Sequence, residues 1–385
     1  MKKSHSIFKG APSSKIKVWV LSPSLQSNDD NIDYYYDFSQ SIAEYSRVFT
    51  ELNVTWLWQP VNMGNFREVI ETIEAEKENG KQIPVVLNLC DGDEVNGTPG
   101  ISVVKLLEEK DIIFTGSDEY FYHITTSKVP MKTAFDNAGV PNAAWEIIRT
   151  PDTDPQTVFN KLGKPVIIKP AVSGGSMGVG IRNVVDNERA FSEILKSMYD
   201  GYRGWNLTAD GIIAETFISG PEYTVLISGS YDDPANAVVY TPVERVFHQS
   251  LPDREKFLSF DRLWEIYEDE SAMPNEENFY EYRLAPAELT DAIKKISWDA
   301  YCATRGKGYT RVDIRMDAQC GKLHVLEVNA QCGISEDENF TSIGAILRFS
   351  GKRFSQLVIE IINDAFVRAS KKKHAYVRTG NNARA

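Results

Sequence analysis

Cysteine is scarce in this chain, and the few cysteines are not clustered. There are four of them, widely separated and without a Cys-x-x-Cys motif: Cys90, Cys302, Cys320 and Cys332. A disulfide framework or a compact zinc site would need cysteines in closer, paired positions. The spacing therefore favours a reduced, cytoplasmic setting.

Long apolar runs and an excess of positive charge are also missing. No stretch is long enough to span a bilayer, and the polar residues 1–5 do not open a signal peptide. The formal net charge of −12 argues against a general affinity for nucleic acid. We therefore expect neither a membrane nor a nucleic acid as a partner.

What remains is an ordinary globular composition, with 42% hydrophobic and 25% charged residues. The 385 residues suffice for two or three compact units. In the first third of the chain, short apolar runs alternate with amphipathic stretches. They predict strands at 16–21, 54–58, 83–89 and 112–115 and helices at 38–52, 66–78 and 103–109.

This alternation predicts an open, mostly parallel, doubly wound sheet with helices on both faces. Ligands of such sheets bind beyond the carboxyl ends of the strands. The acidic loop 90–97 follows one of these ends. It forms either one wall of a binding site or a plain surface turn, and the residues alone leave both readings open.

A glycine-rich loop follows in the middle of the chain. A helix at 125–138, with Thr125 or Thr126 as its N-cap, precedes a short strand that ends near Lys169. The loop 171–180 then contains four glycines and leads into a strand at 181–184. It matches neither a Walker A loop nor a dinucleotide fingerprint. A mobile lid over phosphates explains so many glycines better than a plain turn does.

The residues 311–333 predict a β-hairpin with a polar face. Arg311, Asp313 and Arg315 alternate on the first strand. On the second strand Leu323, Val325, Glu327 and Asn329 alternate, which places Glu327 opposite Asp313 and Asn329 one step beyond. Facing carboxylates destabilise a sheet unless a cation lies between them, and Mg²⁺ prefers such oxygen ligands. The alternative is a solvated polar face.

The other stretches complete the outline. Two strands surround Ser219 in the segment 211–227, and helices are predicted at 286–305 and 354–367. The segment 253–282 is rich in acidic and aromatic residues with little periodicity, which indicates a long functional loop with a partial helix.

Several of these motifs occur in the order found in the ATP-grasp superfamily. From about Thr125 to Leu357, the chain most closely resembles the D-alanine:D-alanine ligases. The resemblance depends on four motifs that together are highly specific: Lys128 in its helix, Val166-Ile-Ile-Lys-Pro before the glycine loop, Glu215 followed by Ser219-Gly-Pro-Glu-Tyr-Thr-Val, and Arg311-Val-Asp with Leu326-Glu-Val-Asn.

The resemblance implies an α/β and α+β architecture, in which an N-terminal doubly wound parallel sheet precedes two α+β lobes that clasp ATP. The expected domains are an N-terminal α/β domain (1–122), a central α+β lobe with the glycine-rich lid (123–209), a C-terminal lobe (210–370) and a disordered basic tail (371–385). We also expect a homodimer.

The resemblance further implies a role for each motif residue. Lys128 and Lys169 contact the phosphates of ATP, beneath the glycine-loop residues Gly174, Gly175 and Ser176. Glu215, Thr216 and Ile218 border the adenine, Leu326 packs on its face and Glu222 binds the ribose. Two Mg²⁺ ions, with Mn²⁺ as an alternative, are held by Asp313, Glu327 and Asn329. Arg311, Lys256 and Ser176 are the expected catalytic residues, and Arg311, Asn329 and Gly333 contact the substrate.

The residues that grip amino acids in this family are altered here. The segment 22–30 lacks the family's Ser-x-Glu motif, the family's histidine is replaced near Cys90, a glycine-loop serine is Gly175, a tyrosine is Phe257 and a later serine is Glu338. Acidic residues surround the altered positions: Asp29, Asp30, Asp91, Asp93, Glu94, Glu336, Asp337 and Glu338. They either favour a cationic or hydroxyl-rich acceptor or are solvated loop residues.

The resemblance therefore implies an ATP-dependent carboxylate–amine ligase that acts through an acyl phosphate, with small-molecule carboxylate and amine substrates. Two alternatives stay open. One is a genuine D-alanine:D-alanine ligase, and the other is an ATP-binding protein of this fold without ligase turnover.

Overall fold

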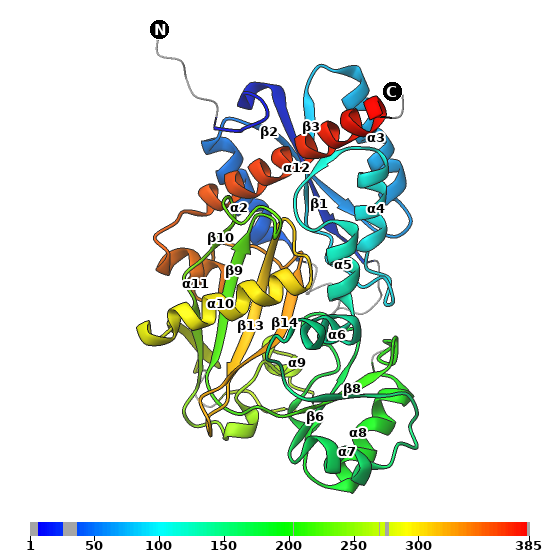
Figure 1. Ribbon diagram of the computed structural model, residues 1–385, viewed down its shortest axis with the longest axis vertical. Helices are drawn as coiled ribbons and strands as arrows, with labels where there is room; N and C mark the ends of the chain where they lie inside the picture. The colour runs from blue at the N-terminus through cyan, green and yellow to red at the C-terminus, as the bar shows by residue number, and fades with distance from the viewer. Residues whose placement is uncertain (1–6, 26–36, 203, 269, 274–276, 383–385) are drawn as a thin grey trace.

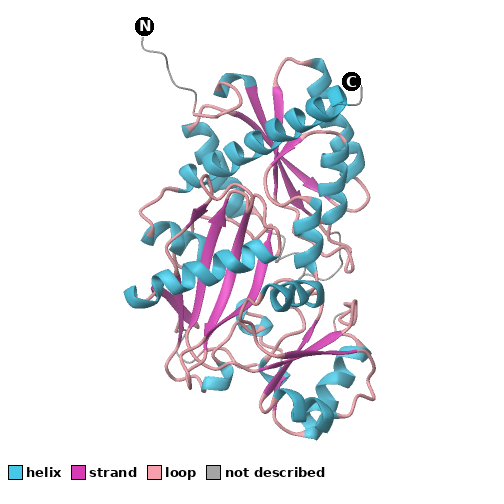
Figure 2. Cartoon of the chain, viewed as in Figure 1, coloured by secondary structure: helices cyan, strands magenta, loops and turns pink. Residues whose placement is uncertain are grey.

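Three separate β-sheets organise the chain in the computed structural model, which describes residues 7–25, 37–202, 204–268, 270–273 and 277–382 (Figure 1). Side chains are described up to residue 372. Figure 2 shows that helices cover each of the three sheets. Among the residues described, no helix combines the length and apolarity needed to cross a membrane.

The N-terminal sheet is entirely parallel, with the strand order β2-β1-β3-β4, as the alternation of strands and helices predicts. Its strands are β1 (Ile16–Pro23), β2 (Thr55–Val61), β3 (Ile83–Asn88) and β4 (Ile113–Phe114), preceded by the short 3₁₀ turn η1 (Ser13–Lys15). Its helices are α2 (Ser39–Glu51), α3 (Phe66–Asn79), α4 (Ile101–Glu109) and α5 (Glu119–Thr126). A parallel sheet must bury both faces, and α3 and α4 cover one of them.

The other face of this sheet is covered by α2 and by the last helix of the chain, α12 (Phe354–Asn382). Figure 1 shows α12 crossing the N-terminal domain, where Arg368 donates a hydrogen bond of 3.0 Å to the carbonyl of Phe114. The helix also continues beyond residue 371 to Asn382, a stretch for which the sequence predicted a disordered basic tail. Alanine, lysine and arginine in this stretch are good helix formers.

The central lobe contains a small antiparallel sheet with the order β5-β8-β6-β7. Its strands are β5 (Trp145–Ile148), β6 (Val166–Pro170), β7 (Val184–Val185) and β8 (Ile212–Thr216), and its helices are α6 (Lys128–Ala138), α7 (Pro155–Leu162), η2 (Ile181–Asn183) and α8 (Glu188–Asp200). The prediction of one helix starting at Thr125 or Thr126 is wrong. These threonines end α5, and the Ser127 side chain caps α6 by accepting from the Val129 N–H.

The C-terminal sheet has the order β12-β11-β9-β13-β14, with β10 beside β9. Its strands are β9 (Glu222–Ser228), β10 (Val238–Val239), β11 (Val243–Phe247), β12 (Tyr280–Leu284), β13 (Tyr309–Met316) and β14 (Leu323–Ala330). The accompanying helices are η3 (Asp253–Glu255), α9 (Phe260–Leu263), α10 (Ala287–Ala303) and α11 (Ser342–Phe349). α10 packs on the apolar face of β9, β13 and β14, so the charged side chains lie on the opposite face.

The pairing of the strands suggests domain boundaries that differ slightly from the expected ones. β8 begins after residue 209 but pairs with β5 and β6. α12 packs on the N-terminal sheet. We therefore propose that the central lobe extends to Thr216 and that the N-terminal domain includes α12.

Gln331 connects the N-terminal domain to the C-terminal lobe. Its side chain is 1% exposed and accepts hydrogen bonds from the N–H and the hydroxyl of Ser117, at 2.9 and 3.3 Å. It also donates to the carbonyl of Asn88 at the end of β3. The segment after β14 is thereby fixed to the carboxyl end of the parallel sheet.

Replacing Gln331 with alanine should lower the free energy of unfolding by about 2 kcal/mol, because buried backbone groups lose their partners. Urea unfolding measures the change. Gln319→Ala, in the exposed turn before β14, is the matched control and should change stability by less than about 0.5 kcal/mol. Equal effects of both substitutions would contradict the connecting role of Gln331.

Candidate active site

The hairpin of β13 and β14 has the predicted register around its polar residues. Asp313 pairs with Glu327, and Arg311 pairs with Asn329. A β-bulge then shifts the register, because Ile314 pairs with Val325 and leaves Leu326 as the extra residue.

The bulge corrects one part of the prediction. Val325 does not share a face with Glu327, because it packs in the apolar core with Ile314 and Val328. Strict alternation would place Val325 and Val328 on opposite faces. The bulge allows both valines to be buried and leaves Leu326 and Glu327 partly exposed between them.

Asp313 is neutralised by Arg311. The Arg311 guanidinium donates to both carboxylate oxygens at 2.9–3.1 Å, and the Asn329 amide donates at 3.1 Å. Burial by itself would raise the pKa of Asp313, but Arg311 and Arg245 outweigh it and the pKa is lowered. Asp313 is therefore a charged oxygen donor at neutral pH.

Glu327 differs from Asp313 because its carboxylate has no hydrogen-bond or ion-pair partner within the described residues. Its negative charge acts on the ammonium of Lys128, whose pKa burial lowers and Glu327 partly restores. Two carboxylates and an amide oxygen on adjacent strands are the donor set that Mg²⁺ takes. The residues present thus fit the predicted metal.

The two predicted phosphate-binding lysines lie on either side of the glycine loop. Lys128, at the start of α6, donates to the Ser173 hydroxyl at 3.0 Å and is 8% exposed. Lys169, near the end of β6, pairs with Glu215 at 2.8 Å. Both ammonium groups are within electrostatic reach of one another.

Lys132 is a residue that the sequence analysis missed. It is fully buried one helical turn after Lys128 and pairs with the second oxygen of Glu215 at 3.3 Å. Burial by itself would raise the pKa of Glu215, but Lys132 and Lys169 outweigh it and lower the pKa to about 2. The spacing of four residues from Lys128 was a signal that both lysines share one helix face.

Glu222, the predicted ribose ligand, is also held by two cations that the sequence analysis did not assign. Arg245 on β11 and Arg315 on β13 each donate to one of its oxygens. Arg315 donates as well to the carbonyls of Ile218, at 3.3 Å, and Lys256, at 2.9 Å. Arg315 therefore joins the predicted adenine edge to the long loop.

Three other predicted site residues, Thr216, Gly333 and Lys256, lie in different parts of the structure. Thr216 ends β8 and its hydroxyl donates to the Leu162 carbonyl at 2.7 Å. Gly333 follows β14, and a side chain placed there would meet nothing within 4 Å, so its backbone is open to a ligand. The ammonium of Lys256 pairs with Asp253 at 2.8 Å.

The glycine loop and the long loop contact each other directly. The Ser176 hydroxyl donates to the Leu258 carbonyl at 2.8 Å, and the Trp264 indole donates to the Gly175 carbonyl at 2.8 Å. Gly175 has a φ of +55°, and a Cβ there would be 3.0 Å from Trp264. The two segments thus form one unit.

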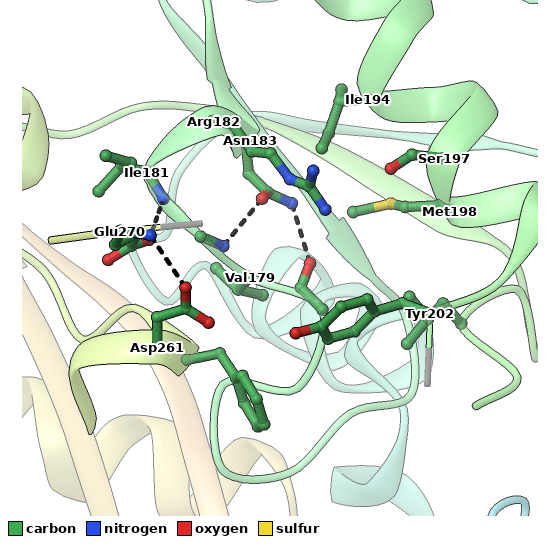
Figure 3. Close-up of a pocket in the computed structure, with 14 residues that line it drawn as sticks. Val179, Ile181, Arg182, Asn183, Ile194, Ser197, Met198, Tyr202, Asp261 and Glu270 are labelled. Atoms are coloured by element: carbon green, nitrogen blue, oxygen red, sulfur yellow. Dashed lines mark hydrogen bonds between the residues drawn. The ribbon is translucent and has the colours of Figure 1, made fainter. Parts of the chain in front are cut away.

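Figure 3 shows the second contact between these loops, beside a pocket that both of them line. The Glu270 carboxylate accepts from the Ile181 N–H at 2.7 Å, and the Asp261 carboxylate accepts from the Glu270 N–H at 3.0 Å. The Asn183 side chain joins both ends of the turn 178–180, because it donates to the Gly178 carbonyl at 3.0 Å and accepts from the Gly180 N–H at 2.8 Å. The Glu270 carboxylate therefore joins the long loop to the end of the glycine loop, and Asp261 fixes the backbone of Glu270.

Most of the acidic residues that surround the altered amino-acid positions have structural partners. Asp29 and Asp30 lie outside the described residues. Hydrogen bonds or ion pairs engage the following five: Asp93 with Asn96, Glu94 with Gly100 and Ser102, Glu336 with Arg47, Asp337 with Asn339 and Phe340, and Glu338 with Arg348. Asp91 is the exception, because no partner from another residue engages its carboxylate in the described part of the chain.

Comparisons with known proteins point in one direction. The model of the family described as "D-ala D-ala ligase C-terminus" matches residues 134–363. The D-alanine--D-alanine ligase of Alcanivorax borkumensis is 28% identical over 269 residues, which are 68% of this chain and 72% of that protein. The enzyme of the same name from Glaesserella parasuis is 26% identical over 304 residues, 78% of this chain and 88% of that protein.

A solved structure has the same fold. The crystal structure of D-alanine--D-alanine ligase from Bacillus anthracis complexed with ATP matches with a TM-score of 0.66 at 17% sequence identity, and covers 94% of this chain and 100% of that one. The predicted ATP-grasp architecture is therefore confirmed.

Replacing Lys132 with methionine should lower the free energy of unfolding by about 3 kcal/mol at pH 7, because a buried carboxylate loses one of its two cations. The pKa of Glu215 is lowered, so the charge pairing contributes fully above the ordinary carboxyl pKa of 4.5 and is lost as the pH falls towards about 2. The deficit of the variant should therefore shrink below pH 4.5.

Urea unfolding at pH 7 and at pH 3.5 measures both effects. Lys161→Met is the matched control, because Lys161 pairs with Glu146 on the surface of the same lobe. It should cost at most about 1 kcal/mol. A Lys132→Met variant as stable as Lys161→Met would show that the buried pair adds no stability.

Hydrogen exchange should slow together in 171–180 and 253–268 when ATP and Mg²⁺ are added, because hydrogen bonds join the two segments. Trp264→Phe removes one of these bonds. In this variant, the decrease in exchange rate on adding ATP and Mg²⁺ should differ more between the two segments than in the unaltered protein. Protection of one segment alone in the unaltered protein would refute a joint lid.

Proposed function

The chain belongs to the D-ala D-ala ligase family of ATP-grasp enzymes, which form carbon–nitrogen bonds, and we propose that it joins a small carboxylate to a small amine with the hydrolysis of ATP to ADP. Its substrates differ from the two D-alanines of the relatives. The altered amino-acid positions support this difference.

The proposal depends mainly on one observation: two lysines and a glutamate from three different secondary-structure elements lie close enough to interact. Lys128 starts α6, Lys169 lies next to the end of β6, and the charges of Lys169 and of Glu327 on β14 both act on Lys128. A triphosphate with bound metal needs cations on one side and carboxylates on the other. A protein that only binds nucleotide has no use for Arg311 beside the metal ligands, so this residue favours turnover.

In the proposed arrangement, Lys128 and Lys169 contact the phosphates and the glycine loop, with Gly174, Gly175 and Ser176, covers them. The adenine lies between the edge formed by Glu215, Thr216 and Ile218 and the side chain of Leu326. Glu222 retains free lone pairs, beyond those used by its two arginines, to accept from the ribose hydroxyls. Asp313, Glu327 and Asn329 would hold two Mg²⁺ ions, which would neutralise charge on the phosphates.

The chemistry has two steps. The substrate carboxylate attacks the γ-phosphorus of ATP and gives an acyl phosphate and ADP, and the amine then attacks the acyl carbon and displaces phosphate. In this proposal, Arg311 and the N–H of Gly333 stabilise the negative charge that develops on the acyl oxygen. Lys256 and Ser176 lie on the two joined loops, so closure brings both to the reacting groups.

Glu327→Gln tests the proposal. The substitution should reduce ATP-dependent phosphate release by at least about 100-fold, because a carboxylate that binds metal becomes neutral, and should leave the unfolding transition cooperative. Phosphate release is measured with pooled L- and D-amino acids. Glu288→Gln, on the exposed face of α10 behind the same sheet, is the control and should keep full activity.

The same assay separates the rival functions. Rapid release with D-alanine alone would identify a genuine D-alanine:D-alanine ligase. ATP binding without release for any pair of acid and amine would identify a binding protein. Near-normal turnover of the Glu327→Gln variant would exclude the proposed metal site.

A further inference from the structure

The side chains on the charged face of β13 form a row that extends from the predicted nucleotide site towards the predicted substrate site. Arg315, Asp313, Arg311 and Tyr309 follow one another at intervals of two residues and share this face. Arg315 lies at the end where Glu222 and Ile218 border the predicted nucleotide site. Tyr309 lies at the opposite end, so the face runs from the nucleotide past the metal ligands to the substrates.

At the substrate end, the face meets the carboxyl ends of the parallel strands. Cys332, after β14, is within electrostatic reach of Arg311 and also of Asp91, after β3. Tyr309 is likewise within reach of Asp91. This end of the N-terminal sheet is where ligands of open parallel sheets bind.

Asp91 is an acidic residue whose charge no cationic side chain within the described residues neutralises. More than a third of its surface is open to solvent, yet protein surrounds it closely enough that desolvation raises its pKa to about 6. No side chain in the described residues pairs with it, whereas the five other described acids near the altered positions have partners. At neutral pH a partly desolvated, unpaired carboxylate favours a bound cation.

Two buried hydroxyls at the same end also lack partners within the described residues. One belongs to Tyr309 on the charged face, and the other to Ser22, the residue before the last of β1. Both residues are 1% exposed. Ser22 directly follows Leu21, whose carbonyl accepts from the Leu89 N–H, so it neighbours the chain that leads to Asp91. Buried hydroxyls without partners indicate a place where a polar ligand or water completes the hydrogen bonding.

We propose that Asp91 determines the amine specificity of the enzyme by binding a second, protonated nitrogen of the acceptor amine. The acceptor class is then a diamine or another amine with an additional positive charge, and an acceptor with its own free carboxylate is disfavoured. This inference assumes the ligase activity proposed above.

The proposed binding is compatible with the reaction. The unprotonated nitrogen forms the new bond to the acyl carbon while the carbon–oxygen bond to phosphate breaks. Inorganic phosphate leaves, and the attacking nitrogen loses its proton to solvent. The second nitrogen keeps its proton and stays paired with Asp91, which therefore acts in binding and not in proton transfer.

A matched pair of acceptors tests the assignment. 1,4-Diaminobutane and n-butylamine have the same number of carbon atoms and differ in one ammonium group. With a fixed pool of carboxylates, ADP formation should show a kcat/KM at least about tenfold higher for the diamine. Asp91→Asn should raise the KM for the diamine at least about tenfold, and leave both the rate with n-butylamine and the affinity for ATP unchanged.

The control is Asp93→Asn, because the amide oxygen can still accept from the Asn96 N–H. It should retain the preference for the diamine. A preference for the diamine that persists in Asp91→Asn, or equal kcat/KM for both acceptors in the unaltered enzyme, would overturn the assignment of Asp91.

Calorimetric titration of 1,4-diaminobutane into the enzyme with a non-hydrolysable ATP analogue gives a second measurement that does not depend on turnover. Binding that Asp91→Asn abolishes, without ADP formation from any pair of substrates, would support the cation site and refute the ligase activity. ADP formation without Asp91-dependent binding of the diamine would do the opposite.

Discussion

The pairing of buried charges is the constraint on which this active site depends. Glu222 lies between Arg245 and Arg315, Asp313 lies against Arg311, and Glu215 lies between Lys132 and Lys169. An unpaired charge in these positions would cost several kcal/mol, so each carboxylate requires the strand or helix that supplies its cation. Glu327 and Asp91 are more exposed and have no cationic partner within the described residues, and they lie where ligands are proposed to bind.

Much of the fold could be predicted from the sequence, because local patterns specified it. Period-two and period-3.6 patterns located the parallel sheet, the hairpin and most helices, and the facing of Asp313 and Glu327 followed from simple alternation. The face of Val325 could not be predicted in this way. A bulge changes the alternation by one residue, and it is favoured by packing against residues far away in the sequence. The packing of α12 on the first sheet is also long-range.

The sequence predicted the residues that belong to a recognisable motif. It did not predict the buried residues that hold the motif residues in position. Lys132, Arg245 and Arg315 are buried behind the residues that would contact ATP, and they were missed because one sequence does not reveal which acid each cation meets. The sequence also suggested more free carboxylates around the predicted substrate site than the structure contains. Asp93 and Asp337, for example, accept hydrogen bonds from backbone N–H groups in turns. The acidic residue that matters could be distinguished only after the others were found to be occupied.

The return of α12 to the first sheet has a consequence for how the protein is made. β1 to β4 are synthesised before both lobes, but the core beneath Ile16, Val18 and Val20 is completed by α2 together with α12, and α12 is synthesised after both lobes. The N-terminal domain therefore leaves part of an apolar face uncovered throughout translation of both lobes, and it completes its core only when the long intervening segment has been closed into a loop. In this chain the order of synthesis and the order of domain completion run in opposite directions.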